Sequence, residues 1–330
     1  MTLDLQQAAR DHLWLHFTRM AAYGDSEVPI IVRGDGCYLE DANGKRYLDA
    51  LAGLFAVQIG YSYGDEVGQA AHEQMKELPF YTNWSYAHPR AIELAHEVAQ
   101  LAPGDLNRVF FVSGGSEAVE SAWKLARQYH LARGERRWKA IARRTAYHGT
   151  TMGALSINGI AAIKNAFEPL VPETFHVRNT NRYHRPEEET EEEFTAFLLD
   201  DLEQAIVAAG PSTVAMVIME PVQNAGGAFT PPAGYFQGVR EICDEYGILL
   251  CADEVITGFG RLGEVRHPSG PDHERQGPLV GVRVDRRSDR DRQGLRAVPR
   301  RAVHVHARDH VRRSPRHVRD RSEEHRDHEA

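Results

Sequence analysis

The sequence has few cysteines and no long apolar run. Its 330 residues contain three cysteines, Cys37, Cys243 and Cys251, too few for the disulfide framework of a secreted domain, so we expect a reducing, cytoplasmic location. No apolar run reaches the length of about 18 residues that a membrane-spanning helix needs, so we expect no membrane partner. The first residues show no basic segment followed by an apolar core, so we expect no secretory leader.

The end of the chain lacks most residues that build a core. Residues 265–330 contain no Ile, Phe, Tyr, Trp, Met or Lys, but 17 arginines, 11 acidic residues and 8 histidines. Such a composition rarely folds by itself, so we expect a low-complexity, disordered tail that is unlike a native domain. The interspersed acids and the missing aromatics argue against a nucleic-acid partner. No pair of histidines has convincing helical spacing, so we expect no metal site.

Residues 1–264, in contrast, have a globular composition and an α/β pattern. Apolar runs typical of buried strands alternate with segments of helical spacing, which indicates a mostly parallel sheet covered on both faces. The runs cover residues 109–112, 140–142, 214–219 and 248–252, and the helical segments cover 117–130 and 235–246. Residues 31–49 predict a hairpin with Asn43-Gly44 in its turn. The acidic stretch 186–193 is interpreted as the solvated start of a helix.

Polar clusters follow these runs at the places where ligands bind in open α/β sheets. Ser113–Glu117 offers glycines and a helix start, which suit a phosphate, although a plain glycine turn would look the same. Tyr147–Thr150 offers an aromatic ring that stacks on a flat ligand or covers the sheet. Glu220–Gln223 offers an acid and an amide, or simple loop capping. Asp253 at the end of a buried strand needs a partner, either a cation, a helix cap or a protonated ring nitrogen. Together the clusters describe a site for pyridoxal 5'-phosphate.

Five segments then carry a specific resemblance. The sequence resembles the class III (omega-type) aminotransferases of fold type I over residues 28–264, with the motifs in the family's order. This resemblance implies an aspartate-aminotransferase-like α/β large domain and a partial small domain. The motifs are G-D-G-C-Y-L-E-D-A-N-G-K-R-Y-L-D-A-L-A-G-L-F at 34–55, F-F-V-S-G-G-S-E-A-V-E-S-A-W-K-L-A-R at 110–127, A-Y-H-G-T-T at 146–151, M-E-P-V-Q at 219–223 and A-D-E-V-I-T-G-F-G-R-L-G-E at 252–264.

The resemblance also implies roles for individual residues. Gly115 and Ser116 would hold the cofactor phosphate. Tyr147, with His148 beside it, would lie over one face of the ring, and Val255 would pack against the other face. Asp253 would pair with the ring nitrogen, while Glu220 and Gln223 would support Asp253 and the ring hydroxyl. The resemblance places Leu54, Phe55 and Trp84 in the amine pocket.

The implied activity is transamination, in which an amine or amino acid passes its nitrogen through the cofactor to a keto acid or aldehyde. The family forms homodimers, which we regard as doubtful for this chain. We expect residues 1–60 to contribute to the small domain and dimer surface, and 61–264 to form an incomplete cofactor-binding domain.

The chain departs from the family after Glu264. The family's Schiff-base lysine, in an A-K-G motif, follows the acid that matches Asp253, but the last of the five lysines here is Lys164. No catalytic residue is therefore assigned, and we expect this chain to be inactive. A frameshift would explain the departure, since the codons of residues 289–294, read one nucleotide later, permit Thr-Val-Thr-Ala-Lys-Gly. Sequencing the gene across this region tests that hypothesis. Two alternatives stay open: a non-catalytic cofactor binder, and another fold-type-I reaction such as that of a racemase or mutase.

Overall fold

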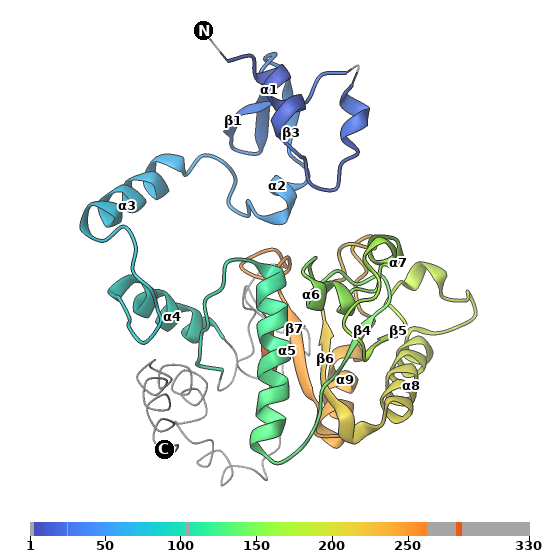
Figure 1. Ribbon diagram of the computed structural model, residues 1–330. Coiled ribbons are helices and arrows are strands. Elements are labelled where there is room, and N and C mark those ends of the chain that lie inside the picture. Colours follow the sequence, from blue (N-terminus) through green and yellow to red (C-terminus); the bar gives the residue numbers. More distant parts are fainter. Residues whose placement is uncertain (1–2, 25, 103–105, 263–281, 286–330) are drawn as a thin grey trace, which may run out of the picture. The chain divides into compact units, whose positions relative to one another are not determined.

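The computed structural model describes residues 3–24, 26–102, 106–262 and 282–285 (Figure 1). They divide into two units, each described here by itself. Of the described residues, 3–24, 26–102, 107–109 and 258–262 belong to the N-terminal unit, and 106, 110–257 and 282–285 belong to the sheet unit. The domain boundaries expected at residues 60 and 264 stay predictions. None of the helices in the described part of the chain is both long and apolar enough to span a bilayer.

The N-terminal unit contains a three-stranded antiparallel sheet and four helices. The predicted hairpin does turn at Asn43-Gly44, because the Asp41 carboxylate accepts hydrogen bonds from the Asn43 and Lys45 amides and from the Tyr47 hydroxyl. Residues 31–40, expected to form one arm of it, instead form two strands that pair antiparallel with each other. The elements are α1 (Leu5–His12), the 3-10 turn η1 (Met20–Tyr23), β1 (Ile31–Asp35), β2 (Tyr38–Asp41), β3 (Arg46–Leu48), α2 (Ala52–Phe55), α3 (Gly64–Glu77) and α4 (Pro89–Leu101).

The sheet unit contains a five-stranded sheet in the order β5-β4-β6-β7-β8 (Figure 1). The first four strands are parallel, which confirms the predicted parallel sheet, and β8 pairs antiparallel with β7. Its elements are α5 (Gly115–Ala132), β4 (Lys139–Arg143), α6 (Met152–Ile157), α7 (Ala161–Lys164), η2 (Asn165–Phe167), β5 (Thr174–Val177), η3 (Arg182–His184), α8 (Glu191–Ala209), η4 (Pro211–Thr213), β6 (Val214–Met219), α9 (Tyr235–Glu245), β7 (Leu249–Asp253) and β8 (Val282–Asp285).

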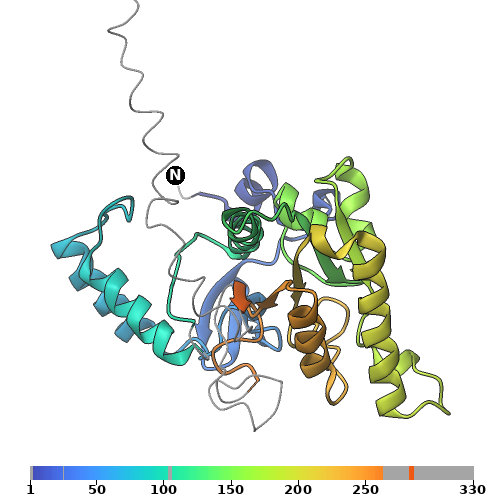
Figure 2. The same ribbon diagram turned by 90° about the horizontal axis from the view of Figure 1, so that it is seen from below.

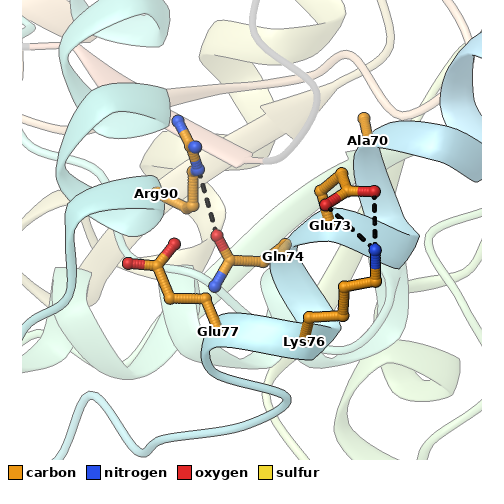
Figure 3. A pocket seen from close by; sticks show the side chains of 6 residues that line it. All are labelled: Ala70, Glu73, Gln74, Lys76, Glu77 and Arg90. Atoms are coloured by element: carbon orange, nitrogen blue, oxygen red, sulfur yellow. Dashed lines mark hydrogen bonds and ion pairs between the residues drawn. The ribbon is translucent and has the colours of Figure 1, made fainter.

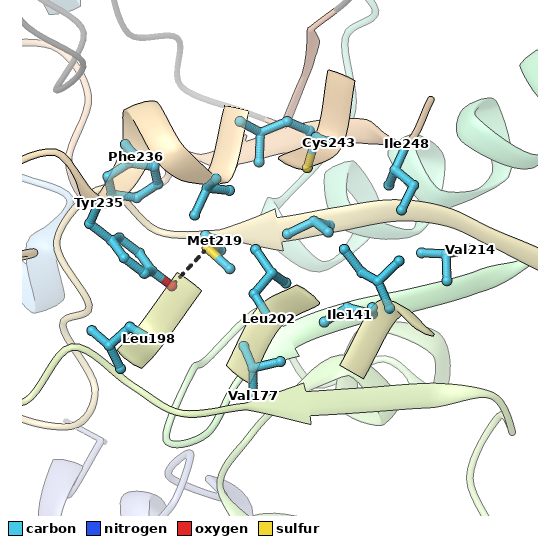
Figure 4. Packing of buried hydrophobic residues seen from close by; sticks show 14 of the residues in the cluster. Ile141, Val177, Leu198, Leu202, Val214, Met219, Tyr235, Phe236, Cys243 and Ile248 are labelled. Atoms are coloured by element: carbon cyan, nitrogen blue, oxygen red, sulfur yellow. Dashed lines mark hydrogen bonds between the residues drawn. The ribbon is translucent and has the colours of Figure 1, made fainter. Parts of the chain in front are cut away.

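Both faces of this sheet are buried. Alternate residues of the central strand β6 point to opposite faces, so Val217 and Met219 pack against α8 and α9, whereas Met216 and Ile218 pack against α5 and α6. Figure 4 shows the first of these clusters, in which the Tyr235 hydroxyl lies 3.5 Å from the sulfur of Met219. Figure 2 shows the ribbon of Figure 1 seen from below. Burial of the strands on both faces explains why they read as continuous apolar runs.

Two parts of the structure differ from the sequence expectation. The apolar run 109–112 forms no strand, and the Phe110 side chain is 78% exposed, because no described strand is placed to pair with it. Residues Val282–Asp285, within the segment expected to be a disordered tail, form β8, because the outer edge of β7 offers unpaired backbone groups. The rest of 265–330 lies outside the described residues.

Candidate functional site

Three neighbouring strands of the sheet end in charged, buried residues. Arg143 is the last residue of β4, Glu220 follows β6 directly, and Asp253 is the last residue of β7. Since Met219 pairs in register with Ala252, Glu220 and Asp253 come next along their strands. The structure therefore brings two of the predicted site residues to one edge of the sheet, at the carboxyl ends of its strands.

His148 lies against Asp253. The Nδ1 atom of this fully buried ring lies 2.8 Å from Oδ2 of Asp253, and its Nε2 lies 3.9 Å from Oε2 of Glu220. Burial alone lowers the pKa of His148, but the Glu220 charge and the hydrogen bond and charge of Asp253 outweigh it and hold the pKa above the ordinary 6.5. The other Asp253 oxygen accepts the backbone N–H of Val255 at 3.1 Å. Asp253 thus has its expected partner in a histidine, which orients it.

Glu220 is held by a residue that sequence reasoning missed. Nη2 of Arg143, which is completely buried, donates to the Glu220 carbonyl oxygen and lies 3.3 Å from Oε2 of the same residue. The remaining oxygen of Glu220, Oε1, accepts the backbone N–H of Tyr147 at 3.2 Å. A charged side chain buried to this degree needs such a partner.

The predicted phosphate turn is the N-terminus of the 18-residue helix α5. Its first N–H groups have no acceptor within the helix and carry the positive end of the helix dipole. The Ser116 hydroxyl accepts the backbone N–H of Thr150 at 3.0 Å. A Cβ on Gly149, whose φ is +120°, would lie only 2.2 Å from that hydroxyl, so only glycine allows this approach. These contacts join the phosphate turn to the segment that carries Tyr147 and His148.

Val255 and Gln223 complete the set. A Cβ on Gly115 would lie 3.2 Å from the Val255 side chain, so the phosphate turn also borders the residue assigned to the second ring face. Gln223 is fully buried, and its Nε2 donates to the Arg144 carbonyl at 2.6 Å. Its Oε1 has no hydrogen-bond partner in the part of the chain that the structure describes. An orphaned buried acceptor in this position is available to a ligand hydroxyl.

A second residue missed by sequence reasoning is Asn158, which follows α6. Its buried side chain accepts the backbone N–H of His148 and donates to the Gly149 carbonyl at 2.7 Å. This amide therefore fixes the backbone at His148 and Gly149, in the segment that contacts the phosphate turn. The sequence offered no signal for it, because a single asparagine after a short helix is typical of any helix end.

The three pocket residues stand apart from this description. Leu54, Phe55 and Trp84 belong to the N-terminal unit, where Leu54 is 67% and Trp84 75% exposed. Their assignment to an amine pocket stays a prediction.

The N-terminal unit has a pocket of its own, with a volume of about 710 Å³ (Figure 3). No predicted site residue lines it. Exposed side chains of α3 and α4 do, and they pair with one another, as Lys76 does with Glu73 at 3.0 Å. The lining residues are Ala70, Glu73, Gln74, Lys76, Glu77 and Arg90.

Comparison with known families decides the identity. The family model of aminotransferase class III matches residues 20–266 of the chain. The chain belongs to the class III aminotransferase family. The match ends two residues past Glu264, where the family motifs in the sequence stop. A probable aminotransferase of Mycobacterium tuberculosis is 53% identical over 255 residues, which cover 77% of this chain and 54% of that protein.

Other relatives agree with this family membership. The putrescine–pyruvate aminotransferase of Pseudomonas aeruginosa is 38% identical over 265 residues, 80% of this chain and 58% of that protein. An (S)-enantioselective omega-transaminase from Thermomicrobium roseum, solved by crystallography, superposes with a TM-score of 0.76 at 43% identity, covering 78% of this chain and 58% of that one. This structural similarity confirms the predicted α/β fold. The class III aminotransferase family depends on pyridoxal phosphate. The chain spans little more than half the length of these relatives.

Proposed function

We propose that the sheet unit is the cofactor-binding part of a transaminase and binds pyridoxal 5'-phosphate. The observation that carries the proposal is the set of contacts that joins Ser116, His148 and Asp253. Ser116 contacts Thr150, two residues after His148, and His148 contacts Asp253. One small ligand could therefore reach the phosphate turn and the buried acid together.

The residues present fit this cofactor. The start of α5, with Gly115 and Ser116, would hold the phosphate, because helix N-termini bind anions. Asp253 would accept the ring N–H, and the orphaned Oε1 of Gln223 would accept the ring hydroxyl. Tyr147, whose side chain is half-buried, and Val255 would contact the two ring faces.

When bound, pyridoxal phosphate supplies a cationic ring that withdraws electrons from a substrate carbon. The chain's own contribution is to place charged side chains beside the cofactor ring. Asp253 would hold the proton on the ring nitrogen, and the contact of its Oδ2 with Nδ1 of His148, at 2.8 Å, orients the carboxylate. The amine and the keto acid or aldehyde are the proposed substrates.

The lysine that would capture the cofactor aldehyde is the part that this chain does not supply. Lys139 donates to the Ala209 carbonyl and pairs with Glu173, and Lys164 donates to the carbonyls of Ser156 and Asn158. We therefore propose non-covalent cofactor binding without turnover, the behaviour of a pseudoenzyme.

A binding titration tests the proposal. Adding pyridoxal phosphate to the purified protein, followed by absorbance and fluorescence, is expected to show saturable binding. Asp253→Asn and Ser116→Ala should each weaken it about tenfold or more, the size of one charge-assisted hydrogen bond. Asp200→Asn makes the same chemical change at an exposed position of α8 and should leave binding unchanged.

Borohydride reduction adds the second readout. Intact mass after reduction is expected to equal that of the untreated chain, because no lysine is bonded to the cofactor. A reduced adduct on one lysine would contradict non-covalent binding. Equal, unsaturable signals for the native chain and Asp253→Asn would contradict the site itself.

We also propose a cytoplasmic location. Cys37 and Cys243 are free, and burial raises the pKa of the Cys243 thiol to about 12, so Cys243 stays an inert core group. Unpaired buried thiols are typical of reducing compartments. We expect this chain not to form the family's dimer, and size-exclusion chromatography with light scattering measures its oligomeric state directly.

A further inference from the structure

Arg143 is a buried cation with a specific set of acceptors. Arginine keeps its charge at any ordinary pH, so a completely buried guanidinium needs oxygen partners. Its Nη2 donates to the Glu220 carbonyl and contacts the Glu220 carboxylate, and its Nη1 donates to the Thr180 hydroxyl at 3.4 Å. Arg143 therefore holds Glu220 through both its backbone and its side chain.

The two buried acids of the site consequently have separate partners. Glu220 binds Arg143 and the Tyr147 amide, whereas Asp253 binds Nδ1 of His148 and the Val255 amide. Between the two sets lies Nε2 of His148, which has no hydrogen-bond partner among the described residues and is 3.9 Å from Oε2 of Glu220. A small shift of Glu220 would bring it within hydrogen-bond distance of His148.

Resting on the proposed cofactor site, we propose that Arg143 is a positioning residue: it holds the Glu220 carboxylate off His148, so that His148 stays bonded to Asp253 and Asp253 stays oriented toward the ring nitrogen. Without Arg143, the uncompensated Glu220 turns to Nε2 of His148. The histidine is then shared between two acids, so its bond to Asp253 weakens and that carboxylate is left with the Val255 amide as its firmer contact. The loss falls on the contact between Asp253 and the ring nitrogen.

The test compares two ligands that lack an aldehyde, so that no lysine is involved. Pyridoxamine phosphate has the ring nitrogen, and its 1-deaza analogue has a C–H in that place. The ratio of their affinities measures the contact of Asp253 with the nitrogen. Arg143→Met should lower the preference for pyridoxamine phosphate about tenfold, the scale on which groups that orient a ligand-binding residue act at metal sites.

Controls separate positioning from general damage. A structural role alone would weaken both ligands equally and leave the ratio at the native value. Arg144→Met makes the same change at the next residue, which is exposed, and should not alter the ratio. In Arg143→Met/Glu220→Gln the carboxylate that competes for His148 is gone, so the ratio should return to that of Glu220→Gln alone.

The double variant also covers the case in which Arg143→Met does not fold, because it leaves no uncompensated buried charge. If the affinity ratio of the double variant differs from the affinity ratio of Glu220→Gln by more than about twofold, which is the usual limit of additivity, the inference is overturned. An unchanged ratio in a folded Arg143→Met would overturn it as well. If the native chain binds both ligands equally, it is the proposed function that fails.

Discussion

At the residue scale, His148 makes folding sensitive to pH. Its pKa is raised in the folded protein, since Glu220 and Asp253 together outweigh the effect of burial. The stabilisation of the folded protein by His148 is therefore complete below 6.5, the pKa of the residue in the unfolded chain. It is lost as pH rises through the higher pKa of the residue in the folded protein. We expect His148→Gln to reduce the free energy of unfolding more at pH 6 than at pH 9, measured by urea denaturation.

Two other histidines, the buried His130 and the half-buried His176, supply the control for this measurement. Burial lowers the pKa of His130 and of His176, so their contribution has the opposite sign and is lost as pH falls through 6.5. Both histidines are present in the native chain and in His148→Gln, so their contributions cancel when the two free energies of unfolding are subtracted. An equal loss at the two pH values would show that the pKa of His148 does not differ between the folded and unfolded states.

The residues of the site differ in how far the sequence revealed them. Glu220 and Asp253 were found because each acid follows an apolar run. Arg143 was not, because it is one of two adjacent arginines at the end of a weak strand. Of these, Arg143 is completely buried and Arg144 exposed. Which of two neighbours points inward depends on strand register, which composition alone does not reveal.

At the scale of single elements, helix α8 depends on its first turn. It begins at Glu191, which confirms the interpretation of the acidic stretch as a solvated helix start. The Thr190 hydroxyl accepts the Glu193 amide at 3.2 Å, while the Glu193 carboxylate accepts the Thr190 amide at 2.8 Å.

Removing this capping box tests its weight. Thr190→Ala should lower the free energy of unfolding by about 1 kcal/mol, because a helix N–H loses its acceptor. Thr190→Ser keeps the hydroxyl and should remain near the native value. Urea denaturation measures both, and equal stability of the three proteins would mean that solvent replaces the cap.

Two strand predictions failed for a physical reason. A helix closes its hydrogen bonds within one segment, whereas a strand needs a neighbour that the local sequence does not specify. The run 109–112 is apolar but unpaired, and β5, with a histidine at His176, was missed although it pairs with β4.

At the scale of the whole molecule, burial in the described residues is concentrated in the sheet unit. Trp123 is 4% exposed there, whereas Trp14 and Trp84 of the N-terminal unit are 88% and 75% exposed. Trp123 also donates to the Trp138 carbonyl at 2.9 Å. Its surroundings should therefore change most on unfolding.

Fluorescence during urea denaturation tests this distribution of burial. Trp123→Phe should remove the larger part of the emission change, and Trp84→Phe should leave it almost intact. If Trp84→Phe removes the larger part instead, the tryptophan of the N-terminal unit is shielded from water in solution.

The charged ends of β4, β6 and β7 have a last consequence. Adjacent strands lie about 4.8 Å apart, so the backbone ladder itself spaces Arg143, Glu220 and Asp253. Loops after these strands can lengthen or shorten without disturbing that interval. A single residue inserted inside β6 would instead turn Glu220 to the opposite side of the pleat. Inherited variation in such proteins should therefore spare strand length and accumulate in the connections.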